Sequence, residues 1–289
     1  NNADMKSYGW EMELSWRDRI NEFNYGVRFT LADGQREVTK YPNESGDINT
    51  WYAGKLDGTI WGYTTVGIAQ TQEEMDAHLA NNKPNWGSKW GAGDVMYADL
   101  NGDGEVTSGS STLGDHGDLT VIGNSYARYN FGLTLDGSWK GLDFSVFLQG
   151  VMKRDYWLSG PYFWGASGDE WQSACFTEHL DYWTPDNPDA YYPKPYFGGI
   201  TKNQQVQTGY LQNAAYLRVK NVQIGYTLPK SWTQKASMES VRFYVSGDNL
   251  LTLTGISAIF DPETLGGDWG PGKLYPLQRT ISVGVNVNF

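Results

Sequence analysis

The sequence is poor in the residues on which several protein classes depend. It has one cysteine, Cys175, among 289 residues, so an internal disulfide framework is excluded. Its 22 Lys and Arg against 33 Asp and Glu give a net charge of −11. This charge disfavours a nucleic-acid partner, because phosphate binding requires clustered cations. No apolar run approaches the roughly 18 residues of a membrane-spanning helix, although membrane-crossing strands, which alternate, are not excluded.

Motifs of catalysis are also missing. The three histidines, His78, His116 and His179, have no metal-ligand or Cys–His spacing, and neither Gly-x-Ser-x-Gly nor a phosphate-binding loop occurs. A glycosidase would need two placed carboxylates. With 33 acidic residues, however, neighbouring pairs are expected by chance. We therefore expect that the protein is not an enzyme.

What the sequence does contain is many large rings and much glycine, with 13 Trp, 19 Tyr, 11 Phe and 35 Gly. The rings argue against disorder, and the glycines argue against a helical bundle. Apolar and polar residues alternate with period 2 in many places, most cleanly at Ile281, Val283, Val285 and Val287. This pattern predicts an all-β fold with seven antiparallel strands, at 8–18, 22–33, 126–139, 141–153, 214–229, 240–253 and 277–289.

The fifth predicted strand contains a change of phase. Leu217 and Val219 share one face, whereas Val222 and Ile224 have the other parity. One extra residue in a strand produces such a change, so we expect a β-bulge near Lys220 and Asn221.

The connections between the predicted strands are alternately short and long. Short connections follow the first, third and fifth strands, and long ones span 34–125, 154–213 and 254–276. Outer-membrane barrels show this asymmetry, with short periplasmic turns at one end and long extracellular loops at the other. A secreted β-sandwich or propeller with polar loops is the alternative.

Seven strands do not complete a membrane barrel. Bacterial single-chain barrels have even strand numbers, and an open sheet edge in lipid would leave unpaired N–H and C=O groups. The first predicted strand begins within ten residues of Asn1. We therefore expect residues 1–289 to be the C-terminal part of a larger barrel domain, whose other strands come from preceding chain or from another chain.

Several stretches together suggest a family. They are 5–11 (MKSYGWE), 99–104 (DLNGDG) with 118–124 (DLTVIGN), 216–226 (YLRVKNVQIGY), 241–252 (VRFYVSGDNLLT) and 275–280 (YPLQRT). In order and spacing, the chain resembles the C-terminal third of SusC-like TonB-dependent transporters of the Bacteroidetes outer membrane.

The resemblance implies a function and its partners. It implies the 22-stranded class of plugged transmembrane barrel, with the plug and the TonB-contacting segment lying outside residues 1–289. It also implies location in the outer membrane, a SusD-like surface lipoprotein as partner, and TonB-driven import of oligosaccharides or oligopeptides. The hypothesis from a different class is a secreted β-rich carbohydrate-binding module.

A candidate calcium loop lies in the first long connection. Asp99, Asn101, Asp103 and Glu105 match the start of an EF-hand-like loop, in which Gly104 allows the sharp turn. The twelfth loop position is Ser110, which lacks a carboxylate. In the resembled family an Asp closes the loop just before the Thr-Val-Ile-Gly stretch, which here implies Asp118. The Ser- and Gly-rich insertion leaves Asp115 as a rival, and a polar turn without metal is the alternative.

Aromatic residues of the long loops are candidates for binding cargo. Rings with a polar edge suit sugar faces and peptide side chains, because they bury apolar area and keep a hydrogen-bonding tip. The alternative is that they pack the loops together or form the interfacial girdle. The candidate residues for substrate contact are Trp86, Trp90, Trp157, Tyr162 and Trp164.

Overall fold

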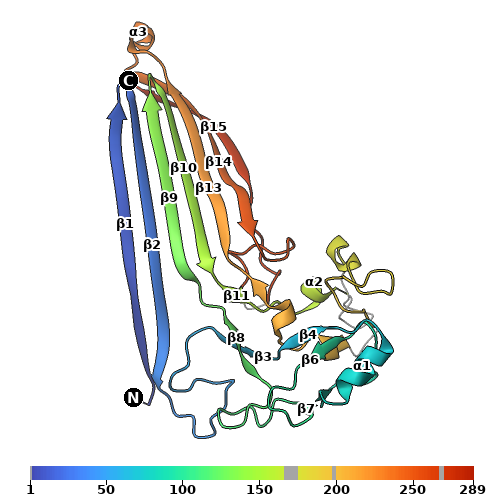
Figure 1. The fold of residues 1–289 in the computed structure, drawn as a ribbon. Coiled ribbons are helices and arrows are strands. Elements are labelled where there is room, and N and C mark those ends of the chain that lie inside the picture. The colour runs from blue at the N-terminus through green and yellow to red at the C-terminus, as the bar shows by residue number, and fades with distance from the viewer. Residues whose placement is uncertain (1, 166–174, 197–199, 267–269) are drawn as a thin grey trace.

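The computed structural model describes residues 2–165, 175–196, 200–266 and 270–289. A tall sheet of seven strands stands beside a unit built from the long connections (Figure 1). We call this unit the loop assembly; it comprises the described parts of 41–127, 154–215 and 255–279. Within the described ranges, no helix combines the length and apolar character needed to cross a membrane.

The seven predicted strands are confirmed, and all neighbours in the sheet are antiparallel. The first hairpin is longer than predicted, because main-chain pairing continues where the apolar alternation has stopped. In sheet order the strands are β1 (Asp4–Ile20), β2 (Phe23–Lys40), β9 (Arg128–Trp139), β10 (Leu142–Lys153), β13 (Tyr216–Thr227), β14 (Ser240–Thr254) and β15 (Thr280–Asn288).

The sheet is open. β15 pairs with β14 from Asp248↔Thr280 to Ser240↔Asn288, as the sequence predicts, and it has no second neighbour among the described strands. β1 likewise has β2 as its one neighbour in the sheet that the structure describes. Both outer strands therefore present an unpaired row of backbone N–H and C=O groups.

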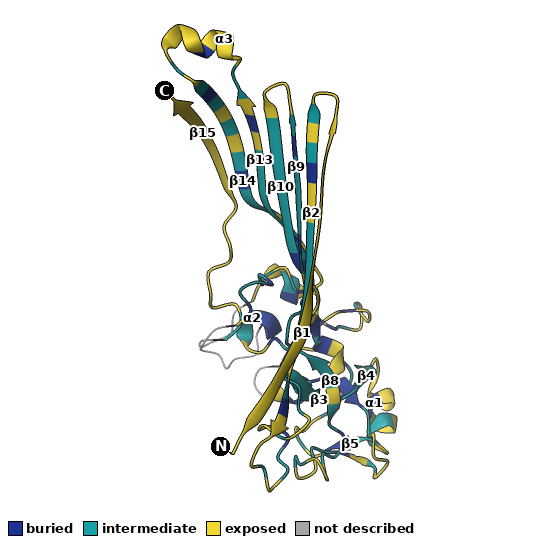
Figure 2. Cartoon of the chain, turned by 90° about the vertical axis from the view of Figure 1, so that its left-hand side faces the viewer, coloured by how far each residue is buried: buried dark blue, intermediate teal, exposed yellow. Residues whose placement is uncertain are grey.

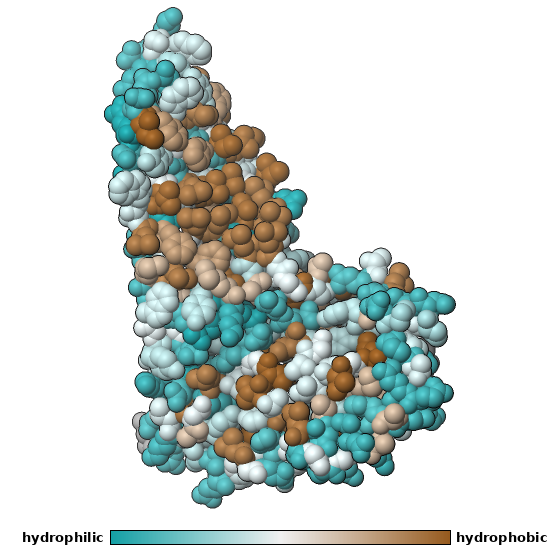
Figure 3. Space-filling model, in the orientation of Figure 1, coloured by the Kyte–Doolittle hydropathy of each residue, from teal (hydrophilic) through white to brown (hydrophobic). Residues whose placement is uncertain are grey.

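Cross-strand pairing aligns the apolar positions into continuous rows. One row near the short turns crosses all seven strands: Ile20, Phe23, Trp139, Leu142, Tyr226, Phe243 and Val285. The middle row contains Trp16, Val27, Leu135, Val146, Val222, Gly247 and Ile281. These rows form a broad apolar band over the strands (Figure 3), and many of its side chains are exposed, Val283 by 79%.

The opposite face of the sheet is polar. The row beside the middle apolar row contains Arg17, Gly26, Asp136, Ser145, Gln223, Ser246 and Ser282. Ion pairs also join neighbouring strands on this face, such as Arg28–Glu13 at 2.9 Å. The sheet therefore separates an apolar surface from a polar one, as the alternation predicts.

The predicted bulge lies at Lys220. Phe147 pairs with Asn221 and Leu148 pairs with Val219, so Lys220 is the extra residue opposite β10. β14 shows a matching irregularity, because Val219 pairs with Leu251 while Asn221 pairs with Asp248. The extra residue restores the apolar side chains on both sides of the bulge to the same face.

The long connections contain regular elements of their own, which the alternation does not predict. Short pairs of strands join β3 (Thr59–Gly62) to β8 (Thr120–Asn124), β4 (Thr65–Ile68) to β6 (Val95–Tyr97), β5 (Lys83–Pro84) to β7 (Glu105–Val106), and β11 (Asp155–Tyr156) to β12 (Gln212–Asn213). The helices are α1 (Gln72–Leu79), α2 (Pro161–Trp164), and the 3₁₀ turns η1 (Thr177–Leu180), η2 (Ile200–Asn203) and η3 (Thr208–Tyr210). At the opposite end of the sheet, α3 (Lys230–Thr233) and η4 (Gln234–Ala236) connect β13 to β14.

The buried core lies largely in the loop assembly, as Figure 2 shows by its concentration of buried residues below the sheet. Its centre is aromatic: Tyr63, Tyr97, Phe163, Trp164, Tyr192, Tyr210 and Phe260 are all buried in one cluster. Since residues from all three long connections contribute to this cluster, they form one packed unit at the end of the sheet.

Candidate functional site

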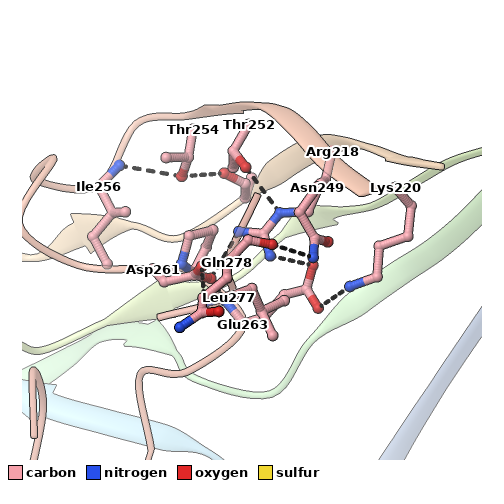
Figure 4. A network of polar contacts seen from close by, with 12 residues as sticks. Arg218, Lys220, Asn249, Thr252, Thr254, Ile256, Asp261, Glu263, Leu277 and Gln278 are labelled. Atoms are coloured by element: carbon pink, nitrogen blue, oxygen red, sulfur yellow. Dashed lines mark hydrogen bonds and ion pairs between the residues drawn. The ribbon is translucent and has the colours of Figure 1, made fainter. Parts of the chain in front are cut away.

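The loop assembly is attached to the polar face of the sheet at its loop end. Tyr216 and Arg218, which have the parity of this face, are buried there. Arg218 forms ion pairs with Asp261 at 2.8 Å and with Glu263 at 3.0 Å, and its Nε donates to the Thr252 hydroxyl (Figure 4).

Lys220 extends this network because of the bulge. Its ammonium lies 2.8 Å from the second oxygen of Glu263 (Figure 4). The bulge places Lys220 and Asn221 on the polar side together, and Asn221 donates to Asp248 on β14. The segment around 261–263 is thus fixed to the sheet by paired charges, which a buried arginine requires.

The predicted calcium loop forms a compact turn. The Asp99 carboxylate accepts hydrogen bonds from the amides of Gly104 at 2.7 Å and Gly102 at 2.6 Å. These backbone bonds, the one from Gly104 foremost, lower the pKa of Asp99. The Asn101 amide donates to Asp103, whose other oxygen accepts from the Glu105 backbone.

The carboxylate of Asp118, and not that of Asp115, is hydrogen-bonded to this turn. Asp118 is fully buried, and its carboxylate accepts from the amides of Leu100 at 2.6 Å and Thr107 at 2.7 Å. Asp115 instead accepts from the amide and hydroxyl of Ser110 inside the insertion. The insertion therefore forms its own turn and leaves Asp118 in reach of the loop.

Four of the five candidate calcium ligands lie in one turn. Asp99, Asn101, Asp103 and Asp118 belong to one hydrogen-bonded turn, whereas Glu105 is exposed at the start of β7. Across the part of the chain that the structure describes, no three His, Cys, Asp or Glu side chains are grouped as metal ligands. Calcium therefore stays a prediction.

The five candidate aromatics lie in and around the core of the loop assembly. Trp86 packs against Tyr63, with ring centroids 4.7 Å apart, and its Nε1 donates to the Lys202 carbonyl. Trp164 is buried against Tyr210 at 4.7 Å and against Trp157 at 6.0 Å. Tyr162 stacks on Phe176. A ligand could reach only part of the following rings, because they are partly buried: Trp86, Trp90, Trp157 and Tyr162.

Trp90 also lines a hollow of about 660 Å³. The hollow lies between the segment after α1 and the segment 182–196, so two long connections form it together. Of the residues that line it, only Trp90 is among the predicted substrate contacts. The aromatic and cationic lining residues are Lys89, Trp90, Tyr182, Trp183, Lys194 and Tyr196. The sequence feature that could have indicated this hollow is the closeness of lysine to an aromatic residue, as in Lys89-Trp90 and Lys194-Pro195-Tyr196.

Comparison with known proteins gives relatives over the full length of the chain, although no family model matches. TonB-dependent receptor P3 of Formosa agariphila is 25% identical over 320 residues, which cover 100% of this chain and 29% of the receptor. TonB-dependent receptor SusC of Bacteroides thetaiotaomicron is 22% identical over 301 residues, covering 100% of this chain and 27% of SusC.

Solved structures agree with these relatives in fold. The structure of the RagAB peptide transporter matches with a TM-score of 0.70 at 22% identity, over 99% of this chain and 30% of that chain. The chain is similar to the C-terminal part of SusC-like TonB-dependent receptors. The resemblance and the fold class expected from the sequence are thereby confirmed.

The similarity covers a limited part of each relative. The chain spans about 30% of the length of the receptors and transporters that it matches. These relatives are named as receptors, transporters and importers, which agrees with the expected lack of enzymatic activity.

Proposed function

We propose that this chain forms the C-terminal wall of a TonB-dependent outer-membrane transporter that imports oligosaccharides or oligopeptides. The observation that carries the proposal is a seven-stranded sheet with one exposed apolar face, one polar face and two edges that are unpaired among the described strands. In lipid, both edges must be paired, because unsatisfied backbone groups cost several kcal/mol each. Further strands therefore continue beyond β1 and β15 into a barrel of the 22-stranded class.

The proposed assembly has other components that supply energy and capture cargo. A plug and a TonB-contacting segment would accompany the remaining strands, and a SusD-like lipoprotein would cover the extracellular opening. The similarity to SusC and to the RagAB importer supports such a partner. The loop assembly, which is packed at the loop end of the sheet, is the part of this chain that would face cargo and lipoprotein.

The secreted carbohydrate-binding module fits the surface less well. A soluble monomer rarely exposes a contiguous apolar patch of more than a few hundred Å². Here, apolar rows cross the whole sheet, and the exposed band includes Val245, Ile281 and Val283. A module in water would have to cover this band, whereas a barrel places it against lipid.

Uptake measured in cells that assemble the whole transporter tests the proposal. We expect the protein in the outer-membrane fraction, migrating as a compact species until it is boiled in SDS. Labelled oligosaccharide or oligopeptide should enter only when the inner membrane is energised and TonB is present. Recovery of the protein from the culture medium, or uptake that persists without TonB, would contradict the proposal.

Calcium forms a separate proposal. We infer that the ion orders the turn at 99–105 through oxygens of Asp99, Asn101 and Asp103, with Asp118 closing the loop. The compact turn and the burial of Asp118 against its backbone support this arrangement. Calcium there would stabilise an extracellular loop and would take no part in transport chemistry.

A further inference from the structure

The hollow beside Trp90 has aromatic walls with polar tips. Tyr182 is exposed at its rim, Trp183 is buried in its wall, and Trp90 and Tyr196 are partly exposed. The Trp183 Nε1 donates to Gln70 at 2.8 Å, which fixes that ring in place. Flat rings held in this way bury the apolar face of a ligand without a large loss of side-chain freedom.

Two lysines give the hollow a positive charge in an acidic chain. Lys89 and Lys194 both line it and are both exposed, and its lining contains no Asp or Glu. Among the described residues, neither ammonium has a carboxylate partner within ion-pair distance. Since the chain carries a net charge of −11, two such cations lining one hollow favour an anionic ligand.

A buried ion pair holds the rim that carries Lys89. Lys202 and Asp94 are both buried, with 2.7 Å between the ammonium and the carboxylate. The Lys202 ammonium also donates to the carbonyl of Lys89 at 2.9 Å, and Asp94 accepts from the Gly91 amide at 2.8 Å. Lys89 adopts a left-handed backbone conformation with φ of 55°. Charged hydrogen bonds thus hold the backbone of the rim, and with it the base of the Lys89 side chain, in one position.

The second lysine is positioned by close packing. The Lys194 amide donates to the Gly93 carbonyl at 2.8 Å, which ties segment 182–196 to the segment after α1. A Cβ at Gly93 would lie 2.4 Å from the Trp183 ring and 2.6 Å from the Lys194 Cβ. Glycine at this position therefore lets the two segments approach until their lysines flank one hollow.

We propose that this hollow binds a carboxylate-bearing unit of the cargo. The flat or aliphatic part of that unit lies against Trp90 and Tyr182, and its carboxylate pairs with Lys89 and Lys194. Two sources have this chemistry: an acidic sugar residue of an oligosaccharide and an acidic residue of a peptide. The inference deepens the proposed function and rests on it, because it assigns a cargo class to a hollow in the loop assembly.

Equilibrium binding to the intact, detergent-solubilised transporter tests the inference. The probes are trigalacturonate, its neutral trigalactose counterpart, a Glu-containing tripeptide and the matching Gln tripeptide. We expect at least one acidic probe to bind more tightly than its neutral partner, and more weakly as salt is added. The double variant Lys89→Gln/Lys194→Gln should weaken that acidic probe about tenfold or more, a change of about 1.4 kcal/mol.

Two control variants separate the hollow from general charge. Lys83→Gln/Lys153→Gln removes the same charge at exposed positions outside the hollow and should leave binding unchanged. Lys89→Arg/Lys194→Arg keeps the charge and should retain binding of the acidic probe. The inference is overturned if acidic and neutral probes bind equally, or if both glutamine variants weaken binding to the same extent.

The outcomes also separate this inference from the proposed function. Preference for trigalacturonate alone identifies acidic glycan as the source, and preference for the Glu tripeptide alone identifies peptide. Binding is measured without any energy source. If the binding pattern holds but no cargo enters energised cells, the proposed function fails and the site stands. If energised uptake occurs but the lysine variants bind normally, the site fails.

Discussion

Arg242 on β14 reaches across the backbone of β13 to form an ion pair with Asp143 on β10. Its Nε lies 2.9 Å from one carboxylate oxygen, and its guanidinium also donates to Gln223 at 3.1 Å. The path crosses Gly225, where a Cβ would lie 2.3 Å from the guanidinium. A glycine in the middle strand therefore lets charges on its two neighbours meet on the polar face.

Gly225→Val should break this contact. The new side chain occupies the path of Arg242, so we expect a loss of about 0.5–1 kcal/mol in the free energy of unfolding of the assembled barrel. The urea midpoint of the heat-modifiable species measures this loss. Gly34→Val is the matched control, because a Cβ at Gly34 meets its nearest atom at an ordinary 3.5 Å. Equal effects of the two substitutions would contradict the role of Gly225.

Val146→Arg and Ser145→Arg test which face contacts lipid. Val146 lies in the middle apolar row, and Ser145 is its neighbour on the polar face, beside Asp136. In a lipid-facing band, arginine at Val146 should cost about 2–4 kcal/mol, while arginine at Ser145 should be mild. The amount of folded protein in the outer membrane and its urea midpoint measure both effects. Comparable losses at the two positions would rule out the face assignment.

Deletion of Lys220 tests the bulge. Without the extra residue, Val219 opposite Leu148 and Asn221 opposite Phe147 become consecutive, so the apolar side chains on both sides keep their face. We therefore expect the deletion variant to assemble in the outer membrane, with a loss of stability from the missing Lys220–Glu263 ion pair and the altered pairing with β14. Lys220→Gln keeps the bulge and loses the ion pair with Glu263, so it should assemble with a small loss of stability. Loss of assembly after the deletion, with normal assembly of Lys220→Gln, would contradict this expectation and show that the bulge itself is required.

His78 should make the loop assembly sensitive to acid. Burial lowers the pKa of His78 below its ordinary value of 6.5, although its Nε2 is hydrogen-bonded to the Tyr97 carbonyl. The unfolded segment therefore takes up a proton at a higher pH than the folded one, and stability falls as the pH drops below about 6.5. Amide hydrogen exchange around α1 should accelerate from pH 7 to pH 5. In His78→Gln, which retains a donor, this acceleration should disappear; its persistence would assign the effect to another group.

Asp118→Asn should loosen the turn at 99–105. The amide can no longer accept from both Leu100 and Thr107, so we expect faster proteolysis of 99–118. Asp115→Asn is the control, because Asp115 contacts only the insertion, and it should have a small effect. If calcium binds, it should lie about 2.3–2.6 Å from the Asp99, Asn101 and Asp103 oxygens, and chelation should reproduce the Asp118 effect. A well-ordered turn with no ion would remove the calcium proposal.

The sequence by itself determined the sheet. Side-chain parity in a strand is local, so the alternation at 281–289 and the change of phase at Lys220 predict faces and a bulge without knowledge of strand neighbours. The order of short and long connections likewise places the loops at one end. Strand ends were less well defined, because pairing of β1 with β2 depends on main-chain hydrogen bonds that carry no apolar pattern.

Only the tertiary structure decided what the long loops build. Lys202 and Asp94 are 108 residues apart in sequence, and the hollow joins Trp90 to Tyr196 from separate connections. Likewise, the choice between Asp115 and Asp118 depended on how the insertion folds. The periodicity of apolar residues and the spacing of motifs depend on residues that are close together in the sequence. These contacts arise instead from packing of distant segments around one aromatic core.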